Sequence, residues 1–259
     1  MFSIDLKNKV VAITGASQGI GEAMADLFAE SGAEVVLLAR NENKLKDNVN
    51  KLLKKGLKAK YFVIDVSNPE NVNKVLSQID KIDILINNAG IHFNDTIEDT
   101  DINKWKELMD INLNGAFYCS KAAVSKMRKN KFGRIINIAS ICGKIGYEYS
   151  GAYNASKFAL IGLTQTQAQE VARENITVNA ICPGWTETEM AEEVLHDEKY
   201  AEYHKIPFEE LKTLSIEAVP IGRYIHPKEI GYLALYLASD YASAITGQAI
   251  NVCGGLCMH

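Results

Sequence analysis

The chain has 259 residues, of which 47% are hydrophobic and 23% are charged, the ordinary proportions of a globular protein. A chain of this length buries enough apolar surface to fold without disulfides or a structural metal. The formal net charge of −4 leaves no excess of basic residues of the kind that a nucleic-acid-binding surface needs. The composition therefore argues against intrinsic disorder and against a nucleic-acid partner.

Targeting and metal-binding signals are missing from the pattern. No apolar run approaches the roughly 20 residues that span a bilayer, and residues 1–9 lack the apolar core and cleavage site of a secretory signal. The five cysteines are odd in number and scattered, and no group of Cys and His residues has the spacing of a zinc site. We therefore expect a cytoplasmic protein with no membrane contact and no metal.

Short apolar runs alternate with helical patterns along the chain. Seven runs predict strands, at Val10–Thr14, Glu34–Ala39, Tyr61–Ile64, Ile82–Ile86, Arg134–Ala139, Thr177–Ile181 and Ala249–Val252. Helical patterns include a stretch that ends at Ser31, a Lys-rich amphipathic stretch from Lys44 to Lys60, Pro69–Gln78, Asn103–Lys129, Ala152–Arg173 and Pro227–Ser239. This order predicts one Rossmann-like α/β domain over residues 1–259, with a doubly wound parallel sheet of about seven strands and helices on both faces.

A glycine-rich turn joins the first predicted strand to the first helix. It reads Thr14-Gly15-Ala16-Ser17-Gln18-Gly19-Ile20-Gly21. Gly15 permits a tight turn, Gly19 leaves room for a close phosphate, and Gly21 lets the helix approach the strand. The free N–H groups at the start of the helix would hold a pyrophosphate. A surface loop with three glycines is the alternative, and the position between strand and helix argues against it.

Further motifs stand at the ends of the later strands. They are Asp65, Asn87-Asn88-Ala89-Gly90, Ser140, Tyr153-Asn154-Ala155-Ser156-Lys157 and Pro183-Gly184, with Thr188 just beyond. In this order and spacing they resemble the classical short-chain dehydrogenase/reductase family, and the similarity continues to the C-terminus. The resemblance implies an oxidoreductase that interconverts a ketone and a secondary alcohol by hydride transfer with a nicotinamide dinucleotide.

The resemblance also implies where the cofactor lies. The positions that match the family's cofactor contacts are Gly15, Ser17, Gln18, Gly19, Ile20, Gly21, Arg40, Asp65, Val66, Asn88, Ala89, Gly90, Tyr153, Lys157, Pro183, Gly184, Thr186 and Thr188. Asp65 would lie against the adenine ring, and Thr188 would reach the nicotinamide carboxamide.

The end of the second strand indicates which cofactor is used. NAD-dependent Rossmann domains place an acid there to hold the ribose 2′-hydroxyl, whereas an arginine suits a 2′-phosphate. Ala39 stands where NAD-using relatives carry aspartate, Arg40 follows it, and Ser17 offers a hydroxyl to the same phosphate. A solvated surface arginine is the alternative, and Gln18 is neutral where some NADP-users carry a second basic residue. We expect NADP(H).

Four residues form the expected catalytic group. Tyr153 and Lys157 are four residues apart on one predicted helix and therefore share a face. A nearby ammonium lowers the pKa of a tyrosine from its ordinary value of about 10. The resemblance implies that Tyr153 is the acid/base, that Lys157 tunes it and holds the ribose, and that Ser140 hydrogen-bonds the substrate oxygen. Asn112, rather than the nearby Asn114, matches the asparagine that completes the family's tetrad.

The segment at about 189–219 is polar and helical and corresponds to the family's substrate lid. The substrate pocket is expected to include His92, Cys142, Trp185 and Met190. Trp185, Met190, Phe208, Leu211 and Leu214 either line an apolar pocket or form the lid's own small core. His196 and His204 are expected to be exposed lid residues.

The substrate class is harder to predict. Residues 139–144, 219–224 and 251–256 are similar to aromatic polyketide ketoreductases and 3-oxoacyl reductases, and hydroxysteroid dehydrogenases share the scaffold. Ile91-His92-Phe93-Asn94 departs from the Pro-Gly-Gly stretch of polyketide ketoreductases, and basic residues that would meet a carrier protein's phosphopantetheine are absent beside Asp65 and after Gly90. We therefore expect a bulky or polycyclic ketone such as a hydroxysteroid, with a 3-oxoacyl or polyketide ketone as the alternative.

Two further expectations concern the protein as a whole. A non-catalytic NADP(H)-sensing regulator is a remote alternative, disfavoured because all four tetrad residues are present. Members of the family are usually tetramers built from their long helices, so the resemblance implies a homotetramer that acts on a small-molecule ketone or alcohol.

Overall fold

The computed structural model describes residues 4–259, so the part of the signal-sequence expectation that concerns residues 1–3 lies outside the described residues. A seven-stranded sheet forms the centre of the fold. Its strands are β1 (Val10–Thr14), β2 (Glu34–Ala39), β3 (Ala59–Val63), β4 (Ile84–Asn87), β5 (Gly133–Ile138), β6 (Ile176–Pro183) and β7 (Ala249–Val252). All neighbours are parallel, in the order β3-β2-β1-β4-β5-β6-β7. The predicted parallel, doubly wound sheet is confirmed.

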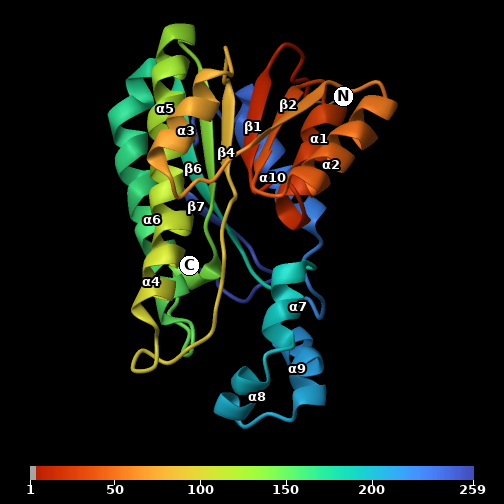
Figure 1. The fold of residues 1–259 in the computed structure, drawn as a ribbon, viewed down its shortest axis with the longest axis vertical. Helices are drawn as coiled ribbons and strands as arrows, with labels where there is room; N and C mark the ends of the chain where they lie inside the picture. The colour runs from red at the N-terminus through yellow and green to blue at the C-terminus, as the bar shows by residue number, and fades with distance from the viewer. Residues whose placement is uncertain (1–3) are drawn as a thin grey trace.

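Helices cover both faces of the sheet. They are α1 (Gly19–Glu30), α2 (Glu42–Lys54), α3 (Pro69–Ser77), α4 (Ile102–Met109), α5 (Gly115–Asn130), α6 (Gly151–Val171), α7 (Glu189–Leu195), α8 (Glu198–His204), α9 (Leu211–Glu217) and α10 (Pro227–Ala238). Figure 1 shows α1, α2 and α10 on one side of the sheet and α3, α5 and α6 on the other, while α7, α8 and α9 project beyond the sheet as a separate group.

Successive side chains of a strand alternate between two apolar layers, one on each face of the sheet. In β2, Val35 and Leu37 pack with α1, α2 and α10, whereas Val36 and Leu38 pack with α3, α5 and α6. Successive strand side chains point to opposite faces of a sheet, so a strand covered on both sides must be apolar at every position. This accounts for the unbroken apolar runs from which the strands were predicted.

The Lys-rich helix is shorter than predicted. α2 ends at Lys54, and Gly56 follows with a φ of +75°, a left-handed conformation that favours glycine and commonly ends helices. Lys60 lies in β3 instead. The prediction that this helix continues to Lys60 is wrong, because the lysine-rich composition extends across the glycine into the next strand.

The predicted helix Asn103–Lys129 is interrupted in its middle. α4 ends at Met109, Asp110–Asn114 form one π-helical turn, and α5 begins at Gly115. Hydrophobic periodicity does not reveal such a turn, because the helical pattern resumes on its far side. A π turn inside a helix frequently marks a functional position, and this one contains Asn112.

Two observations bear on the other expectations. Within residues 4–259, no helix has both the length and the apolar character needed to cross a membrane. The five cysteines are free thiols, and all except Cys142 are buried.

Candidate active site

The carboxyl ends of the strands open into a cavity of about 890 Å³. The reversal of strand order between β1 and β4 creates a crevice at this edge, which is where doubly wound sheets bind ligands. Every predicted cofactor residue except Gly21 lines the cavity, as do Ser140 and the four predicted pocket residues His92, Cys142, Trp185 and Met190. The strand ends therefore bring together residues as far apart in the sequence as Gly15 and Leu256.

The glycine turn has the backbone that its sequence predicts. Gly15 and Gly19 have φ values of +65° and +60°, in the left-handed region that glycine tolerates. A Cβ on Gly21 would lie 2.3 Å from the Gly15 carbonyl oxygen, so a side chain there would push the helix away from the turn. Thr188 faces the turn from the other side, with its Cγ2 3.3 Å from the point where a Gly19 Cβ would be.

Asn88 fastens the glycine turn to β4. Its Nδ2 donates to the carbonyl oxygens of Thr14 and Gly15 at 3.0 and 3.1 Å. The Thr14 hydroxyl accepts in return from the backbone N–H groups of Asn88 and Ala89, at 2.9 and 3.0 Å. Four hydrogen bonds thus join the ends of the two strands that flank the crevice.

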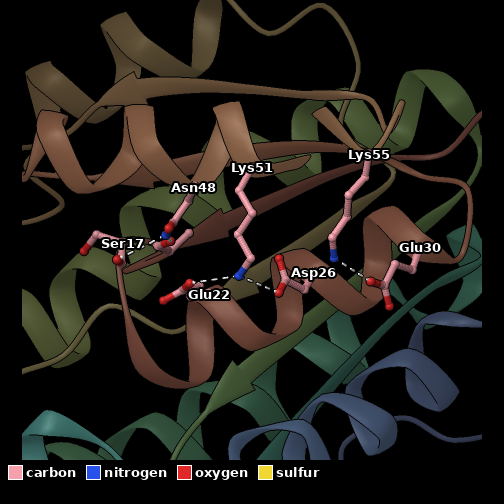
Figure 2. Close-up of polar contacts among 8 residues, drawn as sticks. Ser17, Glu22, Asp26, Glu30, Asn48, Lys51 and Lys55 are labelled. Carbon is pink, nitrogen blue, oxygen red and sulfur yellow. Dashed lines mark hydrogen bonds and ion pairs between the residues drawn. The ribbon is translucent and has the colours of Figure 1, made fainter. Parts of the chain in front are cut away.

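Helix α2 holds the glycine turn from the opposite side. Asn48 Nδ2 donates to the carbonyl oxygens of Ala16 and Ser17 at 3.3 and 3.2 Å. Figure 2 shows that this contact continues as a row of ion pairs between α2 and α1, formed by Lys51 with Glu22 and Asp26 and by Lys55 with Glu30. The sequence analysis missed Asn48, since only the packing of α2 on α1 brings it to a turn about 30 residues earlier.

The end of β2 carries a cation and no acid. Ala39 is buried, and Arg40 is exposed at the wall of the cavity, where its side chain makes no hydrogen bond or ion pair with other described residues. Asp65, at the end of β3, accepts hydrogen bonds from the backbone N–H and the hydroxyl of Ser67. An unpaired guanidinium at this point suits an anion.

Ser140, Tyr153 and Lys157 meet on one wall of the cavity. Tyr153 lies in the first turn of α6, and Lys157 follows one turn later, with its Nζ 5.4 Å from the centre of the Tyr153 ring. Lys157 Nζ donates to the Ile138 carbonyl oxygen at 2.9 Å, which fixes the ammonium at the end of β5. Ser140 Oγ accepts from the Cys142 backbone N–H at 3.1 Å.

Burial is the main cause of the pKa shifts of Tyr153 and Lys157. It raises the pKa of Tyr153 above the ordinary tyrosine value, although a hydrogen bond with Ser140 acts in the opposite direction. It lowers the pKa of Lys157 to about 8. Burial therefore outweighs the lowering of the Tyr153 pKa that we expected from the lysine, because removing the ring from water penalises the phenolate.

Asn112 lies behind the cavity wall and does not line it. Its Oδ1 accepts from the Ile91 backbone N–H at 2.8 Å, and its Nδ2 donates to the Ile91 carbonyl oxygen at 3.0 Å. A Cβ on Gly90 would be 3.3 Å from Asn112 Oδ1 and 3.7 Å from Lys157 Nζ, so the two groups flank one point. Asn114 instead donates to Asp110 within the π turn. Asn112, rather than Asn114, is therefore the asparagine beside Lys157.

His92 contacts the predicted acid/base directly. Its ring lies edge-on to the Tyr153 ring, with centroids 4.7 Å apart, and its Nε2 is 3.4 Å from Ser150 Oγ. Burial lowers the pKa of His92 to about 4, and the Lys157 charge adds to this effect while Asp197 opposes it. The imidazole is therefore neutral at pH 7.

The apolar residues between 185 and 214 have both of the roles that we left open, because some line the cavity and some pack in a cluster. Trp185, Met190, Leu211 and Leu214 line the cavity, while Leu211 also belongs to a small apolar cluster with Leu195, Ala201, Val219 and Tyr224. Phe208 does not line the cavity and is 39% exposed.

The expectation for the two histidines of this segment is half right. His196 is 69% exposed, but His204 is only 17% exposed and lines the cavity. Its ring is 4.3 Å from that of Tyr200, and Tyr149 of the loop before α6 stacks on Tyr203 at 4.5 Å. The sequence analysis missed this aromatic contact, because it assigned no separate helix to residues 198–204.

Comparison with known proteins gives the family. Residues 15–257 match the family model described as enoyl-(acyl carrier protein) reductase. The chain belongs to the short-chain dehydrogenase/reductase family, as its motifs predict.

Individual relatives share its whole length. The chain is 40% identical over 255 residues to a ketoacyl reductase assigned to the monensin polyketide synthase of Streptomyces virginiae, covering 96% of this chain and 97% of the relative. It is 37% identical over 259 residues to the 3-oxoacyl-(acyl-carrier-protein) reductase of Vibrio cholerae, covering 98% and 100%. A solved variant of actinorhodin polyketide ketoreductase with NADPH superposes with a TM-score of 0.91 at 35% identity, covering 96% and 97%.

The lowered pKa of His92 predicts a pH dependence of stability. Between pH 6.5 and about 4 the unfolded chain binds a proton at His92 that the folded protein does not, so the free energy of unfolding falls as the pH falls through this window. We expect His92 to contribute about 3 kcal/mol to this loss. Urea unfolding of wild type and His92→Phe at several pH values measures it: the variant should lose less stability. Equal losses in the two proteins would contradict the assignment.

Proposed function

We propose that the protein is an NADP(H)-dependent ketoreductase that reduces the ketone of a 3-oxoacyl or polyketide substrate. The observation that carries the proposal is the convergence of Ser140, Tyr153 and Lys157 on a cavity that runs from the glycine turn to α7, in a chain related over its full length to ketoacyl reductases. We expected a polycyclic ketone such as a hydroxysteroid first and this class second. The relatives favour the second.

The residues present fit a bound NADP(H). The left-handed glycines leave the backbone N–H groups at the start of α1 open toward a pyrophosphate. Arg40, whose side chain has no hydrogen-bond or ion-pair partner among residues 4–259, offers a cation to a 2′-phosphate. A buried alanine, Ala39, stands at the end of β2, so no carboxylate is present there to hold a 2′-hydroxyl or to repel the phosphate. The similarity to a ketoreductase solved with NADPH supports the same cofactor.

The catalytic residues would act on the substrate oxygen. When bound, the nicotinamide supplies the hydride. Ser140 hydrogen-bonds the carbonyl oxygen, and Tyr153 donates its phenolic proton to the oxygen as negative charge develops there. Tyrosine is protonated at neutral pH, and burial raises the pKa of Tyr153 further, so the proton is present for transfer. The Lys157 ammonium, held by the Ile138 carbonyl, then stabilises the phenolate that remains.

Asn112 is a positioning residue in this scheme. It clamps the Ile91 backbone through both its donor and its acceptor, and it lies across one point from Lys157. The π turn directs its side chain to this place. It therefore orders the cavity wall next to the ammonium without meeting the substrate.

The proposed lid is the segment at about 189–219, within a single domain over 1–259. Together with Trp185, which precedes it, Met190, Leu211 and Leu214 offer an apolar cavity surface for an acyl or polyketide chain. An apolar cluster that includes Leu195, Ala201 and Leu211 holds the short helices of the segment together.

We also propose a homotetramer. Phe117 on α5 and Phe158 on α6 are 41% and 46% exposed, and both helices form the outer layer of one face of the sheet. Exposed aromatic side chains on neighbouring helices suit contact with another copy of the chain.

A substrate panel tests the reaction class. NADPH oxidation should be fastest with acetoacetyl-CoA or another 3-oxoacyl thioester, slower with the bicyclic ketone trans-1-decalone, and slowest with a steroid ketone. The same panel with NADH should give lower kcat/KM throughout, because Arg40 has no phosphate to bind. A steroid ketone turned over faster than the thioester would restore the hydroxysteroid assignment.

Tyr153→Phe tests the catalytic assignment. Removal of the hydroxyl should lower kcat at least about 100-fold, the usual contribution of a general acid, while the Kd for NADPH stays within about twofold. Quenching of protein fluorescence by NADPH measures binding separately from turnover. If wild type bound NADPH and reduced no ketone, the non-catalytic regulator would become the better assignment.

Light scattering tests the assembly. We expect a mass of four chains for wild type and a smaller species when Phe117 and Phe158 are both replaced by serine. A monomeric wild type at micromolar concentration would contradict the homotetramer.

A further inference from the structure

Lys44 joins three parts of the fold at one end of the cavity. It lies in the first turn of α2, where the Asn41 side chain accepts a hydrogen bond from its backbone N–H. Its Nζ is 2.7 Å from Gln18 Oε1 in the glycine turn and 3.2 Å from both carboxylate oxygens of Glu189, the first residue of α7. Gln18 and Glu189 both line the cavity, whereas Lys44 does not, so its ammonium lies just behind the wall that these two residues form.

The same end of the cavity carries Arg40. Arg40, Asn41, Ser17 and Gln18 line it together, and Lys44 is four residues beyond Arg40 at the start of the next helix. A 2′-phosphate is a dianion near neutral pH, and one guanidinium neutralises only half of its charge. The glycine turn supplies no cation, since Gln18 is neutral. Instead, the Gln18 amide oxygen accepts a hydrogen bond from a cation that comes from α2.

The ion pair between Lys44 and Glu189 contributes little free energy. The side chains of Lys44 and Glu189 are 42% and 60% exposed, and exposed ion pairs contribute little free energy. A phosphate dianion held by Arg40 would compete well for the ammonium, because charge-assisted bonds to phosphate are among the stronger hydrogen bonds in proteins.

We propose that Lys44 binds the cofactor's 2′-phosphate together with Arg40, and that it is the second cation that selects NADP(H) over NAD(H). This inference rests on the proposed NADP(H) dependence. Gln18 directs the ammonium to the cavity, and Glu189 competes with the phosphate for it. Lys44 of α2 thereby supplies the positive charge that the neutral Gln18 of the glycine turn does not.

The contrasting interpretation is that Lys44 only attaches α7 to α2 through Glu189. The two interpretations differ in the sign of one effect. If Lys44 only holds α7, removing either partner of the ion pair has the same consequence for ligand binding. If Lys44 binds phosphate, removing Lys44 weakens the binding of a 2′-phosphate, whereas removing Glu189 strengthens it.

Calorimetry with two small probes tests this without turnover. The probes 2′,5′-ADP and 5′-AMP differ only in the 2′-phosphate, and each is titrated into the full-length protein. We expect Lys44→Gln to raise the Kd for 2′,5′-ADP about 10-fold, the effect of one lost charged hydrogen bond. The Kd for 5′-AMP should change less than about twofold, and Glu189→Gln should lower the Kd for 2′,5′-ADP a few-fold.

Lys51→Gln is the matched control. Lys51 lies two turns further along α2 and pairs with Glu22 and Asp26 (Figure 2), rather than with the cavity-lining Gln18 and Glu189 that hold Lys44. Lys51→Gln removes the same charge as Lys44→Gln and should change the Kd for 2′,5′-ADP less than about twofold. Equal effects of Lys44→Gln and Lys51→Gln would overturn the inference, as would shifts in the same direction for Lys44→Gln and Glu189→Gln.

The two probes also distinguish a failure of the proposed NADP(H) dependence from a failure of the proposed role of Lys44. A wild-type protein that binds 2′,5′-ADP no more tightly than 5′-AMP would overturn the NADP(H) dependence itself, and this inference with it. If wild type prefers 2′,5′-ADP and Lys44→Gln leaves the Kd for 2′,5′-ADP unchanged, the role of Lys44 alone is overturned.

Discussion

The Asn88 side-chain amide is the contact on which the geometry of the site depends. It donates to the backbone of Thr14 and Gly15, at the point where the sheet reverses its direction of growth. The crevice of a doubly wound sheet exists only where neighbouring strands send their chains to opposite faces, and nothing in the ladder of the sheet holds the two outgoing loops together. The Asn88 amide does so here together with the Thr14 hydroxyl, and the glycine turn and the residues after β4 are therefore fixed relative to each other.

The two halves of the cavity are built on different principles. On the cofactor side, backbone conformation and the hydrogen bonds between Asn88 and Thr14 decide the shape, and α2 adds a second set of bonds through Asn48. On the substrate side, short helices close a small apolar cluster of their own and meet the loop before α6 through the stacked rings of Tyr149 and Tyr203. Variation in the second half can alter which ketone is accepted without disturbing the first.

The sequence predicted the sheet, the order of strands and helices along the chain, and a set of cofactor positions of which all but Gly21 line the cavity, because apolar runs and strand-end motifs are local signals. Contacts between elements were missed. Asn48 and Lys44 reach the glycine turn only because α2 packs on α1, and His204 enters the cavity because a short helix turns it inward. The pKa of Tyr153 was also mispredicted in direction, since burial depends on the surrounding packing rather than on the spacing to Lys157.

The π turn at Asp110–Asn114 sets the number of residues between α4 and α5 as well as the position of Asn112. Such a turn takes up one residue more than an α-helical path between the same ends. Deleting any one of its five residues would let α4 and α5 merge into an uninterrupted helix. Because the extra residue is absorbed within the turn, α4 and α5 would keep their rotation relative to each other. The change would be confined to the turn itself, where the Asn112 side chain would lose the position from which it bonds the Ile91 backbone. The π turn is therefore a local insertion that supplies one site residue without altering the helices on either side.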